Sequence, residues 1–140
     1  MKPYKSNNMK QTIAIITEDI IFAKVVEPLV AKGSQDIRVV VCQSEEEVEE
    51  MLSSFNCQLV LLDGALKHMC CCKIIQCLSR KALFHFRIWF FPDAICKDYK
   101  HKLQALGVNR VIGKSFNQQK LNNEIASLLV STNIDYAVAN

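Results

Sequence analysis

Residues 58–63 read Gln-Leu-Val-Leu-Leu-Asp, an apolar run that stops at a single acidic residue. A continuous apolar run of this length is typical of a strand buried on both faces, as the strands of a parallel sheet are. Four more apolar runs of similar length occur along the chain. The five predicted strands are Thr12–Ile16, Ile37–Cys42, Gln58–Leu62, Arg87–Phe91 and Arg110–Ile112.

Stretches with the apolar spacing of helices separate and follow these strands. The second begins with Ser44, and Glu47 follows three residues later, a pattern that caps helix N-termini. Pro28 lies inside the first and is expected to bend or shorten it, and Gly33 can end it. Alternating strands and helices predict an α/β fold, a doubly wound five-stranded parallel sheet with helices on both faces. The apolar stripes of the five predicted helices are Phe22, Val25, Val26, Leu29 and Val30; Val48, Met51, Leu52 and Phe55; Ile74, Ile75 and Leu78; Tyr99, Leu103 and Leu106, closed by Gly107; and Leu121, Ile125, Leu128 and Leu129.

The composition is that of one folded domain. Of the 140 residues, 50% are hydrophobic and 22% charged, which supplies one core and excludes a largely disordered chain. No apolar run approaches the roughly 20 residues that cross a bilayer, and residues 1–10 are too polar for a secretory signal. We therefore expect a cytoplasmic protein without a membrane partner. Residues 1–10 are expected to form a flexible leader, residues 11–130 the domain and residues 131–140 a C-terminal tail.

Charge is distributed unevenly along the chain. The formal net charge of +3 is too small to indicate nucleic-acid binding by itself. Five glutamates lie within residues 45–50, whereas residues 97–120 contain six Lys and Arg residues and one acid. The basic segment is either a solvated surface or a docking surface for an acidic partner. Nucleic acid is the weaker alternative, because few aromatic residues lie among these basic residues.

Seven cysteines without an export signal favour reduced thiols over a disulfide framework. Cys70, Cys71, Cys72 and Cys77 form a cluster with His68. Their spacing is poor for zinc, because three consecutive cysteines on a helix point in different directions. We interpret the cluster as packing in the core or at a partner surface, with a redox-sensing thiol as the alternative.

Acidic and basic residues follow several of the predicted strands. Thr17–Asp19 follow the first strand, Asp63 the third and Lys114 the fifth. The carboxyl ends of parallel strands lie at one edge of a sheet, which is where α/β proteins bind ligands. Carboxylates gathered there repel one another unless a lysine or a cation neutralises them, and Mg²⁺ prefers such oxygen ligands.

Each of these residues also has an ordinary structural role open to it. Asp63 is of a type common in turns after strands. Glu18 and Asp19 are suited to the N-terminus of the first helix, where acidic residues are favourable. Lys114 alone would be a solvated lysine. The combination at matching strand ends favours a functional site over these separate roles.

The order of elements and the placing of these residues resemble the receiver domain of bacterial response regulators. The resemblance implies strand order 2-1-3-4-5 in a flavodoxin-like topology, and a place in two-component signalling. It implies that Asp63 accepts a phosphoryl group and that Lys114 pairs with the phosphoryl oxygens. It also implies Mg²⁺ as cofactor, held by Glu18, Asp63 and the backbone carbonyl of Ala65, with Asp19 as an additional candidate.

The sequence departs from the receiver pattern at several positions. The first of the family's two acids is replaced by Thr17, and the hydroxyl residue after the fourth strand by Pro92. Proline has neither a hydroxyl nor an N–H and so donates no hydrogen bond. The aromatic switch position is Val111, and the proline after the family's lysine is Ser115. The family's hydroxyl-to-aromatic relay therefore cannot operate here in its usual form.

Two functions are open at this point, and both make the chain a signalling domain and not an enzyme. In the first, Asp63 accepts phosphoryl with Mg²⁺ from a histidine kinase or phosphotransfer protein. In the alternative, a degenerate receiver acts as a phosphorylation-independent interaction module. The face made by residues 97–130 would then bind a downstream protein or a second copy of the chain. A flavodoxin-like cofactor binder is disfavoured, because no Gly-rich or Ser/Thr-rich loop follows the first strand.

Overall fold

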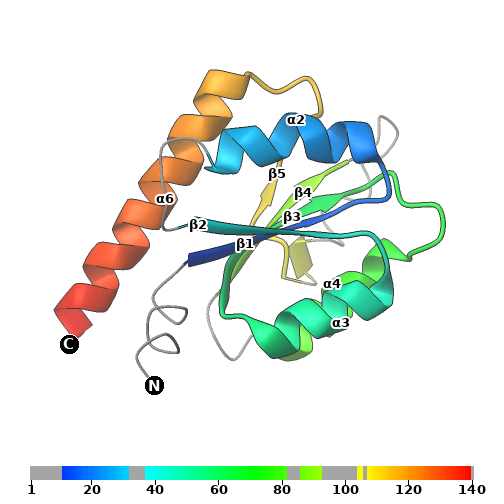
Figure 1. The fold of residues 1–140 in the computed structure, drawn as a ribbon, viewed down its shortest axis with the longest axis horizontal. Coiled ribbons are helices and arrows are strands. Elements are labelled where there is room, and N and C mark those ends of the chain that lie inside the picture. The colour runs from blue at the N-terminus through cyan, green and yellow to red at the C-terminus, as the bar shows by residue number, and fades with distance from the viewer. Residues whose placement is uncertain (1–10, 32–36, 82–85, 93–103, 106, 140) are drawn as a thin grey trace.

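The computed structural model describes residues 11–31, 37–81, 86–92, 104–105 and 107–139. Five parallel strands form one sheet in the order 2-1-3-4-5, as predicted (Figure 1). Every predicted strand is present, with bounds that agree to within one residue. In chain order the elements are β1 (Gln11–Ile16), α2 (Ile20–Ala31), β2 (Ile37–Cys42), α3 (Glu45–Ser54), β3 (Cys57–Asp63), α4 (Cys71–Lys81), β4 (Arg87–Phe91), β5 (Arg110–Val111) and α6 (Gln118–Ala139).

The strands are apolar on both sides because each face of the sheet is covered by helices. Successive side chains of a strand point to opposite faces. Ile13 and Ile15 of β1 therefore pack on the side of α2 and α6, while Ala14 and Ile16 pack on the side of α3 and α4. All four side chains are fully buried. This two-sided burial explains why the strand sequences show continuous apolar runs and no alternation.

The layer of α2 and α6 covers one face of the sheet (Figure 1). Helix α2 continues past Pro28 to Ala31, so the proline does not shorten it as we expected. Pro28 is exposed. Val26 and Val30, which come before and after the proline, are buried against the sheet and hold the helix in place. Helix α6 runs to Ala139, so residues 131–139 continue this helix where a tail was expected. No glycine or proline occurs in α6 to end it earlier.

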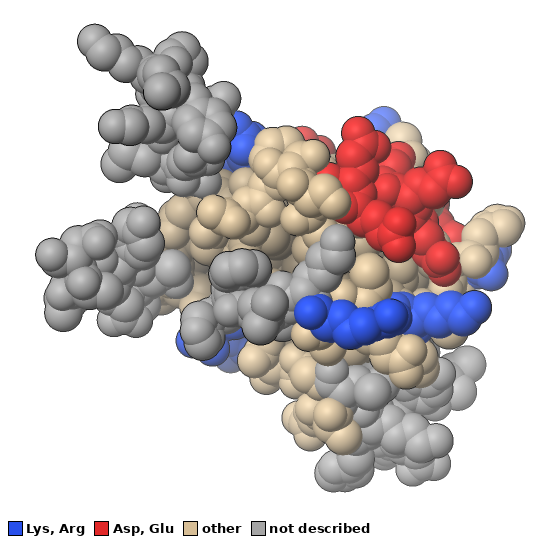
Figure 2. All heavy atoms as spheres, turned by 90° about the horizontal axis from the view of Figure 1, so that it is seen from below, with Lys and Arg blue, Asp and Glu red and all other residues tan. Residues whose placement is uncertain are grey.

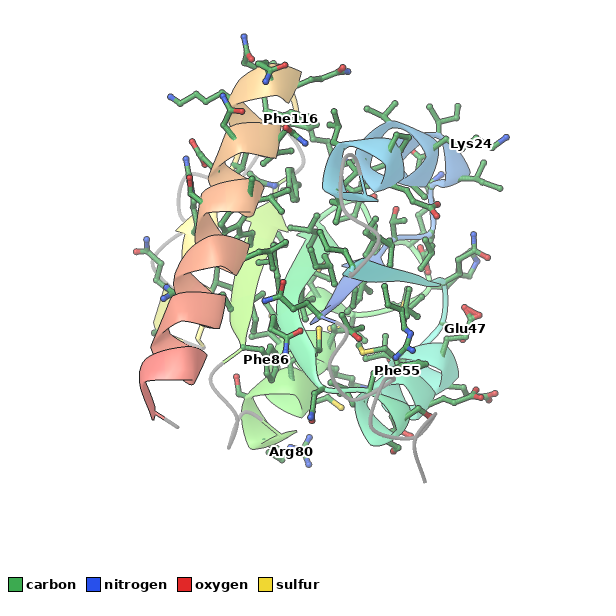
Figure 3. All side chains as sticks on the ribbon, turned by 60° about the vertical axis from the view of Figure 1, so that its left-hand side comes forward. Lys24, Glu47, Phe55, Arg80, Phe86 and Phe116 are labelled. Carbon is green, nitrogen blue, oxygen red and sulfur yellow. The ribbon has the colours of Figure 1, made fainter. Side chains whose placement is uncertain are left out.

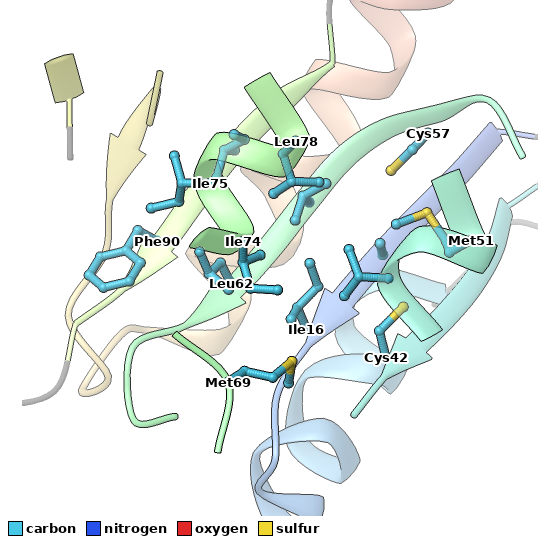
Figure 4. Close-up of a cluster of buried hydrophobic side chains, with 14 of the residues drawn as sticks. Ile16, Cys42, Met51, Cys57, Leu62, Met69, Ile74, Ile75, Leu78 and Phe90 are labelled. Carbon is cyan, nitrogen blue, oxygen red and sulfur yellow. The ribbon is translucent and has the colours of Figure 1, made fainter. Parts of the chain in front are cut away.

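Helices α3 and α4 cover the other face and enclose a second apolar core (Figure 4). The predicted cap of α3 is present, since the Ser44 hydroxyl accepts a hydrogen bond from the Glu47 N–H at 3.2 Å. The Glu47 carboxylate in turn accepts the N–H of Gln43 at 2.8 Å, one residue before the position that a capping box uses. Val48 and Met51 form the buried stripe of α3.

The connection before β5 lies largely outside the described residues. This applies to Tyr99, Leu103 and Leu106, which mark the predicted fourth helix, and to the basic residues between 97 and 102. Residues 104–105 are helical, and Gly107 follows with a φ of 115°, a left-handed conformation that favours glycine and ends helices. Among the described residues, no helix is both long and apolar enough to cross a membrane.

Candidate functional site

Asp63 is a fully buried carboxylate at the carboxyl end of β3. Its Oδ1 lies 2.7 Å from the Nζ of Lys114 and accepts the N–H of Ala65 at 3.0 Å. Its Oδ2 accepts a hydrogen bond from the Thr17 hydroxyl at 2.7 Å. Both carboxylate oxygens therefore have partners from within the chain. The predicted proximity of Asp63 and Lys114 is confirmed, and Thr17 joins them.

Lys114 reaches Asp63 from the loop between β5 and α6. Its side chain is 32% exposed, so the ammonium lies at the edge of the site, while the carboxylate lies inside it. The Nζ is also 5.4 Å from the centre of the Phe22 ring, and the Phe22 and Phe91 rings meet edge to face. Phe116 packs on Phe91 from the other side at 5.6 Å, between β4 and the start of α6 (Figure 3). The Phe22 ring thus lies beside the lysine of the ion pair and belongs to a row of three aromatic rings.

Thr17 is the site residue whose structural role the sequence analysis did not predict. It was identified there only as a neutral residue in place of an acid. In the structure it is fully buried, its hydroxyl donates to Asp63, and the same oxygen accepts the N–H of Asp19 at 2.9 Å. The alternating direction of successive side chains along β1 provides a signal for this role. Ile13, Ile15 and Thr17 are two residues apart, and Asp63 continues Leu59 and Leu61 on the same face of the sheet.

The Glu18 side chain is engaged with the loop that precedes α4. Its carboxylate accepts the backbone N–H groups of Lys67, His68 and Met69, the last two at 2.9 Å from Oε2. The Nδ1 of His68 lies 3.6 Å from the same oxygen. Although desolvation acts to raise the pKa of Glu18, these hydrogen bonds and His68 together lower it below its ordinary value. Glu18 thus has a structural role, because it holds the loop at residues 67–69 in place.

The two other predicted ligands also have structural contacts. The Asp19 carboxylate accepts the N–H of Ile21 at 2.9 Å, and its carbonyl accepts the N–H of Ala23. Asp19 therefore caps α2, the role that its position before the helix allowed. Ala65 donates its N–H to Asp63, as described above, which places this residue beside the site.

The carboxylates predicted to hold Mg²⁺ are each engaged by groups of the chain itself. Mg²⁺ is held by one or two carboxylates together with water and phosphate oxygens. Here Asp63 is the single carboxylate at the centre, and the Lys114 ammonium and the Thr17 hydroxyl occupy its two oxygens. Within the described part of the chain, no group of three or more Asp, Glu, His or Cys side chains is placed to hold a metal ion.

Burial makes Cys42, Cys57 and Cys71 poor nucleophiles. The Cys71 thiol lies 3.8 Å from the carbonyls of Asp63 and Gly64, and burial raises its pKa to about 11. Burial likewise raises the pKa of Cys42 to about 12 and that of Cys57 to about 11. Of these three, only Cys71 belongs to the predicted cluster, and its raised pKa favours packing over redox sensing for this thiol.

The remaining departures from the receiver pattern are arranged around the site. Pro92 is half-buried directly after Phe91 of β4, whose carbonyl accepts the N–H of Gly64 at 2.8 Å. No hydroxyl is present at this position to approach Asp63. Val111 is partly buried and packs against the core that α3 and α4 cover. Ser115 is exposed.

Beside the site, β5 and the start of α6 form an open surface with basic side chains. Arg110 pairs with Glu124 of α6 through both of its terminal nitrogens, and Lys120 is exposed. A cleft of about 400 Å³ lies between these elements and is lined by Arg110, Phe116, Lys120 and Glu124, among others. This surface is the described part of the face predicted from residues 97–130.

The chain matches no protein-family model and no curated protein sequence. Solved structures nevertheless share its fold. The signal receiver domain of a DNA-binding response regulator from Colwellia psychrerythraea 34H has a TM-score of 0.76 and 20% identity, over 86% of this chain and 98% of that one. A response regulator from Thermotoga maritima has a TM-score of 0.71 and 17% identity, over 86% and 98%. A CheY-like receiver domain protein from Methanospirillum hungatei JF-1 has a TM-score of 0.73 and 16% identity, over 90% and 98%. At such identities the likeness establishes the fold, which is that of receiver domains.

Proposed function

We propose that this receiver-fold chain is a signalling module that works by binding a partner protein, without phosphoryl transfer to Asp63. The observation that carries the proposal is the state of the Asp63 carboxylate. It is fully buried. One oxygen accepts a hydrogen bond from Thr17, and the other accepts a hydrogen bond from Ala65 and pairs with the Lys114 ammonium. Asp63, Thr17 and Lys114 then act as a structural link between β1, β3 and the start of α6.

Phosphorylation would require each of these contacts to be rearranged. A carboxylate oxygen that attacks phosphorus in line must be accessible and free of a donor, and a metal must neutralise the charge on the phosphoryl group. The Asp63 oxygens are not accessible, and Glu18 is engaged with the loop at residues 67–69. Pro92 supplies no donor for a phosphoryl oxygen. The arrangement therefore favours the interaction module.

The partner surface that we propose is the face made by residues 97–130. Its described part presents Lys120 in the open and the cleft between β5 and α6. A basic surface steers an acidic partner protein toward itself and raises the rate of encounter. A downstream signalling protein with an acidic docking patch fits this surface better than nucleic acid, because the surface has few aromatic side chains for stacking.

A phosphorylatable receiver is the second candidate, and one observation favours it. Lys114 lies 2.7 Å from Asp63, as a lysine that pairs with phosphoryl oxygens would have to. In this candidate, Glu18 leaves the loop at residues 67–69 and holds Mg²⁺ together with Asp63. A histidine kinase or phosphotransfer protein then donates the phosphoryl group to Asp63.

Incubation with Mg²⁺ and acetyl phosphate, followed by intact-mass measurement, distinguishes the two candidates. We expect no added phosphate on the wild-type chain, although circular dichroism shows it to be folded. The matched comparison is Thr17→Asp, which places a second carboxylate at a position whose side chain already touches Asp63. A wild-type mass gain of one phosphate that Asp63→Asn abolishes would establish the second candidate and overturn the first.

A further inference from the structure

A groove of about 430 Å³ runs between α3 and α4, on the opposite face of the sheet from α2 and α6. Its floor contains Val48 and Ile74, which are 1% and 2% exposed, and half-buried Cys77 lies beside them. The groove therefore has an apolar floor between two helical walls. The Asp63 site lies outside this groove and plays no part in it.

The two walls of the groove carry opposite charges. Glu45 and Glu49 of α3 form one wall, and Lys73 and Arg80 of α4 form the other. All four residues are exposed. Figure 2 shows the acidic side chains gathered in one patch, with basic side chains in a row beside them. Among the described residues, no ion pair crosses the groove, so both charged rows remain available to a partner.

We propose that a second copy of this chain covers the groove and that the chain forms a two-fold symmetric dimer through α3 and α4. A two-fold interface places the same patch of each copy against the other. When the axis lies along the groove, the acidic α3 of each copy faces the basic α4 of its partner. When the axis lies across the groove, α3 faces α3 and the like charges repel. The charge pattern therefore selects a single arrangement.

The directions of the helices agree with this arrangement. Strands β1 to β4 are parallel, and α3 and α4 each connect one strand to the next, so the two helices run in the same direction. A rotation about an axis along the groove keeps the ends of the helices level. Glu45 and Glu49, in the first half of α3, then lie on either side of the level of Lys73 near the start of the partner's α4, and Arg80 lies further along that helix. The long Lys and Arg side chains span the remaining offset.

An unrelated partner would have to match this pattern by coincidence, with a basic row against α3 and an acidic row against α4. A second copy has both rows at the correct spacing by construction. The dimer also leaves β5 and the start of α6 uncovered, since these elements are not part of the groove. Dimerisation and partner binding can therefore be tested separately.

Sedimentation equilibrium at increasing protein concentration tests the proposal. We expect the wild-type chain to dimerise, and the dimer to dissociate in about 1 M salt, where charges more than about 3 Å apart are screened. Lys73→Glu with Arg80→Glu replaces attraction by repulsion at both ends of the interface. We expect this variant to raise the dimer Kd by on the order of 100-fold. Lys24→Glu is the control, because it reverses a charge of the same sign on α2, away from the groove (Figure 3).

Charge complementation provides the decisive step. Glu49→Lys is expected to weaken self-association, because the acidic wall loses charge beyond the first turn of α3. In a mixture of Glu49→Lys with Lys73→Glu/Arg80→Glu, each lysine at position 49 faces acidic residues, so a heterodimer should form more tightly than either homodimer. A wild-type chain that stays monomeric, a dimer unaffected by Lys73→Glu/Arg80→Glu, or a mixture without heterodimer would each overturn the proposal. None of these results depends on whether Asp63 is phosphorylated.

Discussion

Replacing Lys114 with methionine should destabilise the fold more than replacing its partner Asp63 with asparagine. Methionine matches the length of the lysine stem and removes the ammonium that lies 2.7 Å from Asp63. The carboxylate would then remain fully buried with only the Thr17 hydroxyl and the Ala65 N–H as donors. An unpaired buried charge is among the most costly defects in a protein interior.

The magnitude follows from the burial of the two partners. Removing one partner of a buried ion pair costs roughly 3–5 kcal/mol. Lys114 is 32% exposed, so water can reach part of the vacated position, and we expect a loss of about 2–3 kcal/mol. Melting entropy is about 2.1 cal/mol/K per residue, so for 140 residues this loss lowers the Tm by about 7–10 °C.

Urea unfolding of the wild-type chain and three variants measures this effect and tests its cause. Asp63→Asn removes the charge and retains an oxygen for Thr17, and Lys114 can extend into solvent, so this change should cost about 0–1 kcal/mol. The double variant Lys114→Met/Asp63→Asn should be more stable than Lys114→Met alone, because it no longer contains a buried carboxylate. If Asp63→Asn costs as much as Lys114→Met, or if the double variant is the least stable, the reasoning is wrong.

Two further predictions concern the loop and the turn beside the site. Glu18→Gln should lower stability at neutral pH and flatten its acid dependence. The depressed pKa of Glu18 gives a contribution that is complete above the ordinary carboxyl range and lost as the pH falls through the lower folded value. Urea unfolding from pH 7 to about pH 3 measures this, and parallel curves for the two proteins would contradict it. Gly64→Ala should cost about 1–3 kcal/mol, because its Cβ would lie 2.8 Å from both the Phe90 ring and the Phe91 carbonyl. Gly113→Ala is the control, since its Cβ would have no atom nearer than 4.0 Å, and equal losses in the two variants would refute the steric argument.

Helix α3 relates stability to the proposed dimer. Its glutamates at 45, 46 and 47 lie in the first turn, where the helix dipole favours acidic residues, and Glu47 is engaged in the cap. Glu49 lies beyond this turn and is exposed. The acidic run thus has two separable effects, one on the start of the helix and one on the charge of the groove wall. This is why Glu49 is the more informative position for a charge reversal.

Much of the fold was determined by local patterns in the sequence. The apolar runs predicted each strand, because a strand covered on both faces must be apolar at successive positions. The Ser44 cap and the stripes of α3 and α4 were also predicted, since capping and helical periodicity depend on residues only a few positions apart. The end of α6 was not predicted, because the mixed polar and apolar composition of residues 131–139 does not show that they continue a helix.

The sequence by itself determined that Asp63 and Lys114 meet, because parallel strands bring their carboxyl ends to one edge of the sheet. Only the tertiary structure decided which neighbour of β1 reaches that carboxylate. Thr17 shares a face with Asp63 and bonds to it, while Glu18 points toward the loop before α4 and is held by three N–H groups. Successive side chains of an extended chain point to opposite sides. A carboxylate therefore accepts hydrogen bonds only from the donors on its own side. Those donors belong to residues about 50 positions away, so no local pattern could have revealed them.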